Sequence, residues 1–314
     1  MNWYSFKPAD TLFFKGAGPM NMGENHTATA NFPPPAHTME GALRTTILKQ
    51  NKISIEQYYD NSIDGKLLDI IGPADKKAGF SIIGPLFSLN DTLYVPAPYS
   101  WFCDKDNGKK NDRGKMPLQI YKSRLINSRL IKTSLKNLFW AKGEQSELET
   151  LGGKWISLSD LYSHKNTVFI KEIHVFFHEE NRTGIALDSN RSVRPHHLYA
   201  FSHARLNKNV NLIFGVDRAL PISDNGVLNL GAEQRFGLYS KMPDINFIAS
   251  GSGLFMSISQ TAGTKQSNEA VVATGKIQYL GGWDMKRGFH KPMTGFFPPG
   301  SIFNKKLNNN FIQI

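Results

Sequence analysis

The sequence predicts an α+β fold with antiparallel sheets. Residues 38–50 have a clear helical period, whereas most other apolar segments are short and end at glycine, proline or polar turn residues. Strands and helices are intermixed without the regular β-α-β-α alternation that is typical of parallel sheets. The 314 residues are enough for one large domain or two of ordinary size, and a loop-like composition around residues 150–166 divides the chain into segments 1–160 and 161–314.

The expected elements of the first segment begin with a strand over residues 3–15, interrupted near residues 8–10. A polar loop covers residues 16–31, and the helix 38–50 follows it. Strands are expected at 80–83 and 93–95, with Gly84-Pro85 as a break between them. Residues 103–115 are charged and rich in turn residues, which predicts a flexible loop, and residues 117–142 have mixed helical character.

The second segment contains the clearest strand pattern of the chain, at residues 167–178. There Ile173, Val175 and Phe177 alternate with polar residues, which predicts one buried face. A turn is expected at 181–184, then a strand pair at 198–206 and 210–216. Residues 270–280 lead into a glycine-bearing basic loop, and residues 301–303 form the last strand.

The helix 38–50 follows a proline run that favours an extended approach. Thr38 is a suitable N-cap, because its hydroxyl can accept a hydrogen bond from a free backbone N–H. Arg44 lies on the side of the helix opposite the apolar stripe, together with Gly41, Thr45 and Leu48. This position is near the start of the helix, where the backbone attracts anions, and a guanidinium there can donate two hydrogen bonds to a phosphate. The alternative is a core helix with an ordinary surface arginine. The stripe consists of Met39, Ala42, Leu43, Thr46 and Ile47.

The composition indicates a folded, basic protein of a reducing compartment. Lysine and arginine number 37 against 26 acidic residues, which gives a net charge of +11 and a pI near 9.5. Such an excess favours a polyanionic partner, although a merely basic protein is an equal alternative. The single cysteine, Cys103, excludes disulfides and thiolate zinc sites within the chain. Because neither a signal-peptide run nor a membrane-length apolar stretch is present, we expect a cytoplasmic protein without membrane contact.

The nine histidines do not predict a metal site. His174 and His178 share a strand face but lie about 13 Å apart at 3.3 Å per residue, and the adjacent His196 and His197 point to opposite faces. No His-Glu-x-x-His motif is present, so we expect neither a metal nor a cofactor. A general-base histidine for RNA cleavage remains open, because such sites are assembled in space and leave no spacing in the sequence.

A second segment with binding character begins at Gly281-Gly282. Lys286, Arg287 and Lys291 follow, so the missing Cβ atoms allow a phosphodiester backbone to approach and the cations can hold it. The spacing matches neither a Walker A motif nor a dinucleotide fingerprint. A plain hairpin turn is an equal alternative.

Aromatic side chains accompany these basic and glycine-bearing segments. They can stack on unpaired bases, although core packing is the more usual role of such residues. Arg205 and Arg218 are as well explained by surface salt bridges as by phosphate binding. The aromatic residues concerned are Phe32, Trp283, Phe289 and Phe296.

A set of short blocks, in a fixed order along almost the whole chain, carries a family resemblance. The blocks are 10–14 (DTLFF), 32–35 (FPPP), 41–45 (GALRT), 84–87 (GPLF), 93–98 (LYVPAP), 182–188 (RTGIALD), 198–200 (LYA), 281–284 (GGWD), 291–293 (KPM) and 299–301 (PGS). With these blocks the chain resembles subunit three of the type III-B CRISPR (Cmr) effector complexes, within the RAMP superfamily.

The resemblance implies two ferredoxin-like (RRM-like) domains with insertions, and a non-catalytic subunit in antiviral defence. Such a subunit caps the foot of the complex, grips the 5′ tag of the CRISPR RNA and contacts the large polymerase-like subunit and the backbone RAMP subunits, with target RNA met indirectly. Arg44 is implied to bind tag phosphates, and Gly281-Gly282 to belong to a glycine-rich loop beside the RNA. Where the family has Gly-Gly-Glu-Gly-Arg, residues 231–235 read GAEQR, with Ala232 and Gln234 in place of glycines.

The expected RNA-binding site therefore combines the proline-led helix with the glycine-bearing segment. An alternative from the enzyme class is a metal-independent RAMP-type endoribonuclease that processes CRISPR precursor RNA, and a third is a pure protein–protein adaptor. The residues expected to bind RNA are Phe32, Pro34, His37, Thr38, Gly41, Arg44, Thr45, Gly281, Gly282, Trp283, Lys286, Arg287 and Lys291.

Overall fold

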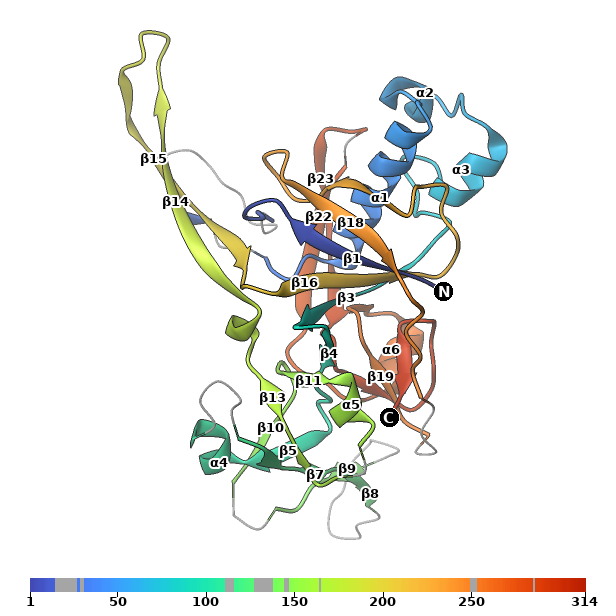
Figure 1. The fold of residues 1–314 in the computed structure, drawn as a ribbon, viewed down its shortest axis with the longest axis vertical. Coiled ribbons are helices and arrows are strands. Elements are labelled where there is room, and N and C mark those ends of the chain that lie inside the picture. Colours follow the sequence, from blue (N-terminus) through green and yellow to red (C-terminus); the bar gives the residue numbers. More distant parts are fainter. Residues whose placement is uncertain are drawn as a thin grey trace. The chain divides into compact units, whose positions relative to one another are not determined.

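The computed structural model describes residues 1–14, 27–28, 31–110, 116–126, 138–143, 147–163, 165–248, 253–284 and 286–314. Among the described residues, the strand pairings with a determined register are antiparallel apart from β15 with β2, and helices are interspersed among the sheets, so the predicted α+β class is confirmed (Figure 1). The chain forms two compact units that interleave along the sequence. Unit 1 comprises Met1–Pro85, Phe177–Asp244 and Tyr279–Thr294, and unit 2 comprises Leu86–Phe176, Ile245–Gln278 and Gly295–Ile314. The division into sequential domains 1–160 and 161–314 stays a proposal.

Unit 1 is built on a sheet with the strand order β3-β16-β1-β18-β17, against which helix α1 packs (Figure 1). The central strand β1 pairs antiparallel with both neighbours, for example Phe6 with Leu212 and with Tyr239. The elements of this unit are β1 (Asn2–Pro8), β2 (Thr27–Ala28), α1 (Ala36–Gln50), α2 (Ile55–Tyr59), α3 (Gly65–Ile71), the start of β3 (Ile82–Leu89), β14 (Phe177–Leu187), β15 (Val193–Leu206), β16 (Val210–Val216), β17 (Asn225–Asn229), β18 (Phe236–Met242), β22 (Gln278–Asp284) and the start of β23 (Phe289–Phe297).

Helix α1 confirms the predicted apolar stripe but begins two residues earlier than expected. Its N-cap is Pro35, whose carbonyl accepts the N–H of Thr38 at 2.9 Å, so the assignment of Thr38 as N-cap is wrong. All five stripe residues are buried. Leu48, expected on the opposite side, is buried as well, which means that the covered arc of the helix is wider than the stripe. The short helices α2 and α3, capped by Ser54 and Asp64, were not expected from the sequence.

Strands β14 and β15 form a long hairpin in place of the expected strand and turn (Figure 1). The expected strand 167–178 is broken into β12 (Thr167–Val168), β13 (Ile170–Lys171) and a short 3-10 turn (Ile173–Val175), and β14 starts only at Phe177. The expected turn at 181–184 is wrong, because these residues pair one by one with β15, from Asn181 with Ser202 to Gly184 with Tyr199. The ladder overrides the local turn preference of Asn and Gly.

The glycine-bearing segment after residue 280 is also a strand. Gly281 and Gly282 lie within β22, and the described turn at residues 286–288 comes only after this strand, so the predicted glycine loop is wrong as a loop.

Unit 2 contains a sheet with the order β13-β11-β4-β3 and several smaller sheets. Strand β3 runs through Gly84-Pro85, where glycine adopts a φ of 96°, so the predicted break there is wrong. The elements are the end of β3, β4 (Thr92–Pro96), β5 (Trp101–Asp104), α4 (Lys105–Lys110), β6 (Leu118–Gln119), β7 (Tyr121–Lys122), β8 (Arg124–Ile126), β9 (Leu138–Trp140), β10 (Leu148–Thr150), β11 (Trp155–Ser157), α5 (Leu158–Leu161), β12 (Thr167–Val168), β13 (Ile170–Lys171), η2 (Ile173–Val175), β19 (Phe255–Ser257), β20 (Thr261–Ala262), α6 (Lys265–Ala270), β21 (Val271–Ala273), β24 (Ile302–Phe303) and β25 (Phe311–Gln313).

Aromatic packing forms the core of unit 2. The ring of Phe176 stacks on Phe87 at 4.6 Å, and Trp155 meets Phe87 edge-on at 4.7 Å. The expected loop at 103–115 is strand and helix through residue 110, and the expected helical character at 117–142 is replaced by strands β6 to β9 in its described part. The polar loop expected at 16–31 lies mostly outside the described residues.

Candidate nucleic-acid interface

The first turn of α1 and strand β22 come together at His37. This side chain is hydrogen-bonded to the backbone of Gly281 while part of the residue remains exposed. The pKa of His37 is lowered, first because its ring is partly withdrawn from water and also because Lys291 is near; the Gly281 bond and Glu40 oppose the shift. The lowered pKa favours the neutral form of the ring.

Gly282 completes the contact between the two predicted segments. A Cβ built at this glycine would lie 3.6 Å from His37 Nε2 and 3.6 Å from Lys291 Cδ, which is ordinary van der Waals distance. The structure thus places the helix and the glycine stretch side by side, although about 240 residues of sequence separate them. It also puts Lys291 next to both.

The exposed side of α1 beyond His37 carries only small side chains, and at Gly41 the backbone is uncovered. Gly41 follows His37 by one helical turn, and Thr45 follows Gly41 by another, so the three share a face. Gly41 is exposed, and a Cβ added there would meet nothing within 4 Å. The Thr45 hydroxyl donates to the Gly41 carbonyl at 3.0 Å, which ties its polar group to the helix itself. Backbone at this face is open to close approach.

The tip of the β22–β23 hairpin is an ordinary turn that carries cations. The Asp284 carboxylate accepts the N–H groups of Lys286 and Arg287, each at 3.0 Å, and Gly288 adopts a φ of 61° to close the turn. The Lys286 ammonium donates to the carbonyl of Tyr59 at the end of α2, at 3.0 Å. The Arg287 side chain is 78% exposed, and its Nε lies 4.0 Å from Asp284 Oδ2, which makes a loose ion pair. The backbone here is thus the plain hairpin turn that was the alternative to a binding loop, and the cationic side chains of Lys286 and Arg287 lie at the surface.

Arg44 does not project freely from the helix, contrary to expectation. Its guanidinium forms an ion pair with Glu40 at 2.9 Å, donates to the carbonyl of Lys76 at 2.7 Å and reaches the Tyr58 hydroxyl at 3.4 Å. Its side chain is only 12% exposed. The guanidinium therefore ties α1 to the segment that contains α2 and α3, and its part in RNA binding stays a prediction.

The remaining predicted residues differ in their surroundings. The ring of Phe32 packs against Phe177 at 4.5 Å and Phe14 at 6.0 Å, which is the core role weighed against stacking. Pro34 is buried and Thr38 is half-buried at the start of α1. Trp283 belongs to β22 by its backbone, and its side chain lies outside the described part of the structure.

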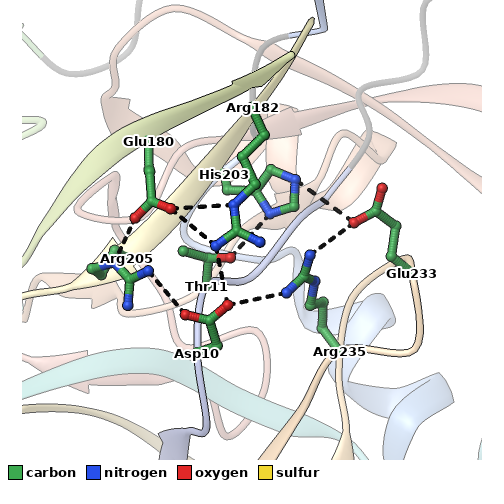
Figure 2. Close-up of polar contacts among 8 residues, drawn as sticks. All are labelled: Asp10, Thr11, Glu180, Arg182, His203, Arg205, Glu233 and Arg235. Carbon is green, nitrogen blue, oxygen red and sulfur yellow. Dashed lines mark hydrogen bonds and ion pairs between the residues drawn. The ribbon is translucent and has the colours of Figure 1, made fainter. Parts of the chain in front are cut away.

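A cluster of charged side chains that sequence analysis missed lies elsewhere in unit 1 (Figure 2). Asp10, just after β1, accepts from Arg182 at 3.0 Å, Arg205 at 2.9 Å and Arg235 at 3.2 Å. Glu180 accepts from Arg182 at 2.9 Å and from Arg205 at 2.6 Å. These arginines hold the carboxylates charged: the pKa of Asp10 is lowered to about 2, mainly by Arg182, and that of Glu180 to about 2, mainly by Arg205.

The same cluster holds residues 231–235, the GAEQR segment. Glu233 pairs with Arg235 at 3.0 Å and lies 3.7 Å from His203, whose ring is buried and hydrogen-bonded to Thr11 at 3.1 Å (Figure 2). Glu233 and Gln234 adopt φ values of 56° and 55°, so both take the left-handed conformation that glycine adopts most readily. Because the cluster's three arginines face three carboxylates, the salt-bridge alternative for Arg205 is confirmed. Its members come from distant segments, and no single spacing could have revealed it.

The described residues hold neither a metal-ligand cluster nor a membrane-spanning helix. No group of three or more His, Cys, Asp or Glu in that part of the chain could hold a metal ion. No helix there is long and apolar enough to cross a membrane.

Comparison with known proteins identifies relatives of this fold. The family model for CRISPR-associated protein (Cas_Cmr3) matches residues 4–266. The chain is similar in fold to a subunit in the cryo-EM structure of Type III-B Cmr-beta bound to cognate target RNA, with a TM-score of 0.57, 16% identity and coverage of 96% of this chain and 86% of that one. A second structure of Cmr-beta, with target RNA and AMPPnP, gives a TM-score of 0.57, 15% identity and coverage of 96% and 85%. No curated protein matches significantly.

Proposed function

The chain belongs to the Cas_Cmr3 family of CRISPR-associated proteins, and from this premise we propose that it is a non-catalytic, RNA-binding subunit of a type III-B CRISPR effector complex. In this role it holds the 5′ tag of the CRISPR RNA, contacts the large polymerase-like subunit and the neighbouring backbone RAMP subunits, and meets target RNA only indirectly. The complex acts in the cytoplasm, in antiviral defence.

The observation that carries the RNA-binding proposal is the junction of α1 with the β22–β23 hairpin. His37 and Gly282 bring the two segments into contact, and Lys291 lies at the same place. The hairpin adds Lys286 and Arg287 at its tip. Cations neutralise phosphates and release counterions, while the bare backbone allows the sugar–phosphate chain to come close.

A salt titration with tagged RNA tests this role. The triple replacement of Lys286, Arg287 and Lys291 by glutamine removes three exposed cations of the hairpin. We expect weaker binding and a log–log salt slope that falls by about 2, since each neutralised phosphate of a single strand contributes about 0.7. A matched control replaces three exposed lysines at other places, Lys52, Lys305 and Lys306, by glutamine.

The two triple variants separate a site from general charge. A loss confined to the hairpin variant supports the proposal. Equal losses in both variants would mean that the RNA is attracted by net charge alone, and unchanged binding by the hairpin variant would remove the hairpin from the interface.

The endoribonuclease alternative now has one candidate general base. The lowered pKa of His37 favours its neutral ring, and the residue lies within the proposed interface; a general base for a ribose hydroxyl needs both. Incubation of the pure protein with repeat-containing RNA in chelator distinguishes the two functions. Retention of intact RNA supports the scaffold, whereas cleavage that disappears in His37→Gln would make the protein an enzyme.

A further inference from the structure

The aromatic residues that the sequence placed near basic segments separate clearly in the structure. Phe32 is packed among other phenyl rings, and Phe296 is half-buried. Phe289, the first residue of β23, is 69% exposed directly after the cationic turn. Its ring lies 6.1 Å from that of His290 in an edge-on arrangement, and the large exposed fraction of Phe289 leaves the ring open to a flat ligand.

Single exposed apolar side chains are common on protein surfaces, but two large ones share one face of β23 with a cation between them. Met293 on β23 is 56% exposed in addition to Phe289, whereas Tyr279 on β22, 67% exposed, lies by strand alternation on the face opposite to Gly282 and Lys291. Alternation along β23 places Phe289, Lys291 and Met293 on one face, with a cation between two apolar groups. Lys286 and Arg287 border the same end of the hairpin.

This combination matches the chemistry of an unpaired nucleotide. A base offers a flat apolar face that stacks on an aromatic ring, and its phosphate offers the charge that a neighbouring cation takes up. A base inside a duplex has both faces covered by its neighbours, so a duplex cannot use such a ring. An acidic protein partner would use the cations but gains no special benefit from a phenyl face.

We infer that the β22–β23 hairpin binds single-stranded RNA, with one base stacked on Phe289 and the adjacent phosphate held by Lys291. This inference rests on the proposed RNA-binding function and assigns its ligand as unpaired nucleotides. Stacking is tolerant of sequence, so Phe289 contributes affinity for an unstacked base and does not select a particular base.

Binding of an eight-nucleotide single-stranded RNA and of an RNA duplex, measured for a set of Phe289 variants, tests the inference. Phe289→Leu keeps an apolar side chain but lacks the ring face, and Phe289→Tyr keeps the ring. We expect the leucine variant to bind the single strand about 5- to 100-fold more weakly, and the tyrosine variant to bind as the wild type does. Duplex binding should not differ among the three proteins.

A matched control is Phe236→Leu, which removes another exposed phenyl ring, on β18 of the same unit. It should leave single-strand binding unchanged. A 2-aminopurine substituted in the RNA should be quenched by the wild type and less by Phe289→Leu.

The outcomes separate the inference from the function on which it depends. Wild-type binding by Phe289→Leu, while the hairpin lysines still matter, would overturn the stacking role and leave RNA binding intact. Equal losses for single strand and duplex would overturn the assignment of unpaired nucleotides. If neither the phenyl ring nor the hairpin cations affect binding, both the inference and the proposed interface fail.

Discussion

The replacement Gly41→Ala tests whether RNA lies on the bare face of α1. Glycine in the middle of a helix is destabilising by about 0.5–1 kcal/mol relative to alanine. The added methyl would meet nothing within 4 Å, so no clash offsets the gain. At about 2–4 °C per kcal/mol for domains of 150–250 residues, the melting temperature should rise by about 1–4 °C.

The same methyl should weaken RNA binding. Each heavy-atom pair pushed out of contact loses about 0.1–0.2 kcal/mol, so the displacement of about ten pairs costs roughly 1–2 kcal/mol. That corresponds to a Kd about 5- to 30-fold higher. A variant that is more stable but binds more weakly is not explained by partial unfolding, which is why opposite signs make the test sharp.

The assay pairs thermal unfolding with filter binding of tagged RNA. Gly65→Ala is the matched control, since Gly65 also lies in a helix, at the first position of α3, with nothing within 4 Å of the added methyl. It should leave RNA affinity unchanged. If Gly41→Ala gains stability and binds RNA as tightly as the wild type, the RNA does not lie on this face of α1.

Three further predictions follow from the polar contacts and the hairpin. The folded-state pKa values of Asp10 and Glu180, both about 2, lie below the usual 4, so the stability that these carboxylates contribute is present above pH 4 and is lost as pH falls from 4 to 2. The difference in melting temperature between the wild type and Asp10→Asn should therefore shrink over that range. A constant difference would contradict the ion pairs. Arg44→Ala should lower the free energy of unfolding by about 1–3 kcal/mol, because it leaves the partly buried Glu40 without its cation, and an unchanged urea midpoint would show that this network contributes nothing. Gly282→Ala should fold with unchanged stability, because the added methyl meets only ordinary contacts, yet it should bind tagged RNA more weakly in the filter assay; equal binding would place the RNA away from β22.

The periodicity of apolar residues was sufficient to predict helix α1 and several of the strands. The stripe of α1 is buried as its spacing indicates, and strands β1, β4, β16 and β24 lie where apolar alternation or short apolar runs place them. The helix start was missed by two residues because α1 begins directly after Pro35 without a side-chain cap, so no capping residue in the sequence marks this position.

The errors occur where distant residues decide the outcome. The turn chemistry of residues 181–184 is real, but pairing with β15 along the whole segment outweighs it. The sequence also placed Arg44 on the correct side of α1 but could not show that Tyr58 and the carbonyl of Lys76 come within its reach. Helical spacing predicts on which side of the helix a side chain lies, whereas the groups that it meets there depend on the rest of the fold.

The candidate site could be predicted in its parts and not as an assembly. The helix and the glycine stretch were each proposed, and the structure joins them through His37 and Gly282. The arginine–carboxylate cluster around Asp10 combines residues from four separate segments, so only the folded chain reveals it (Figure 2).

Photo-crosslinking in the assembled effector complex tests the central claim most directly. CRISPR RNA carrying 4-thiouridine at one tag position at a time would be irradiated, and the crosslinked peptides of this subunit would be identified by mass spectrometry. The proposed function predicts crosslinks within residues 37–45 and 279–293. Efficient crosslinking of the tag to other segments, with none in these two, would contradict it.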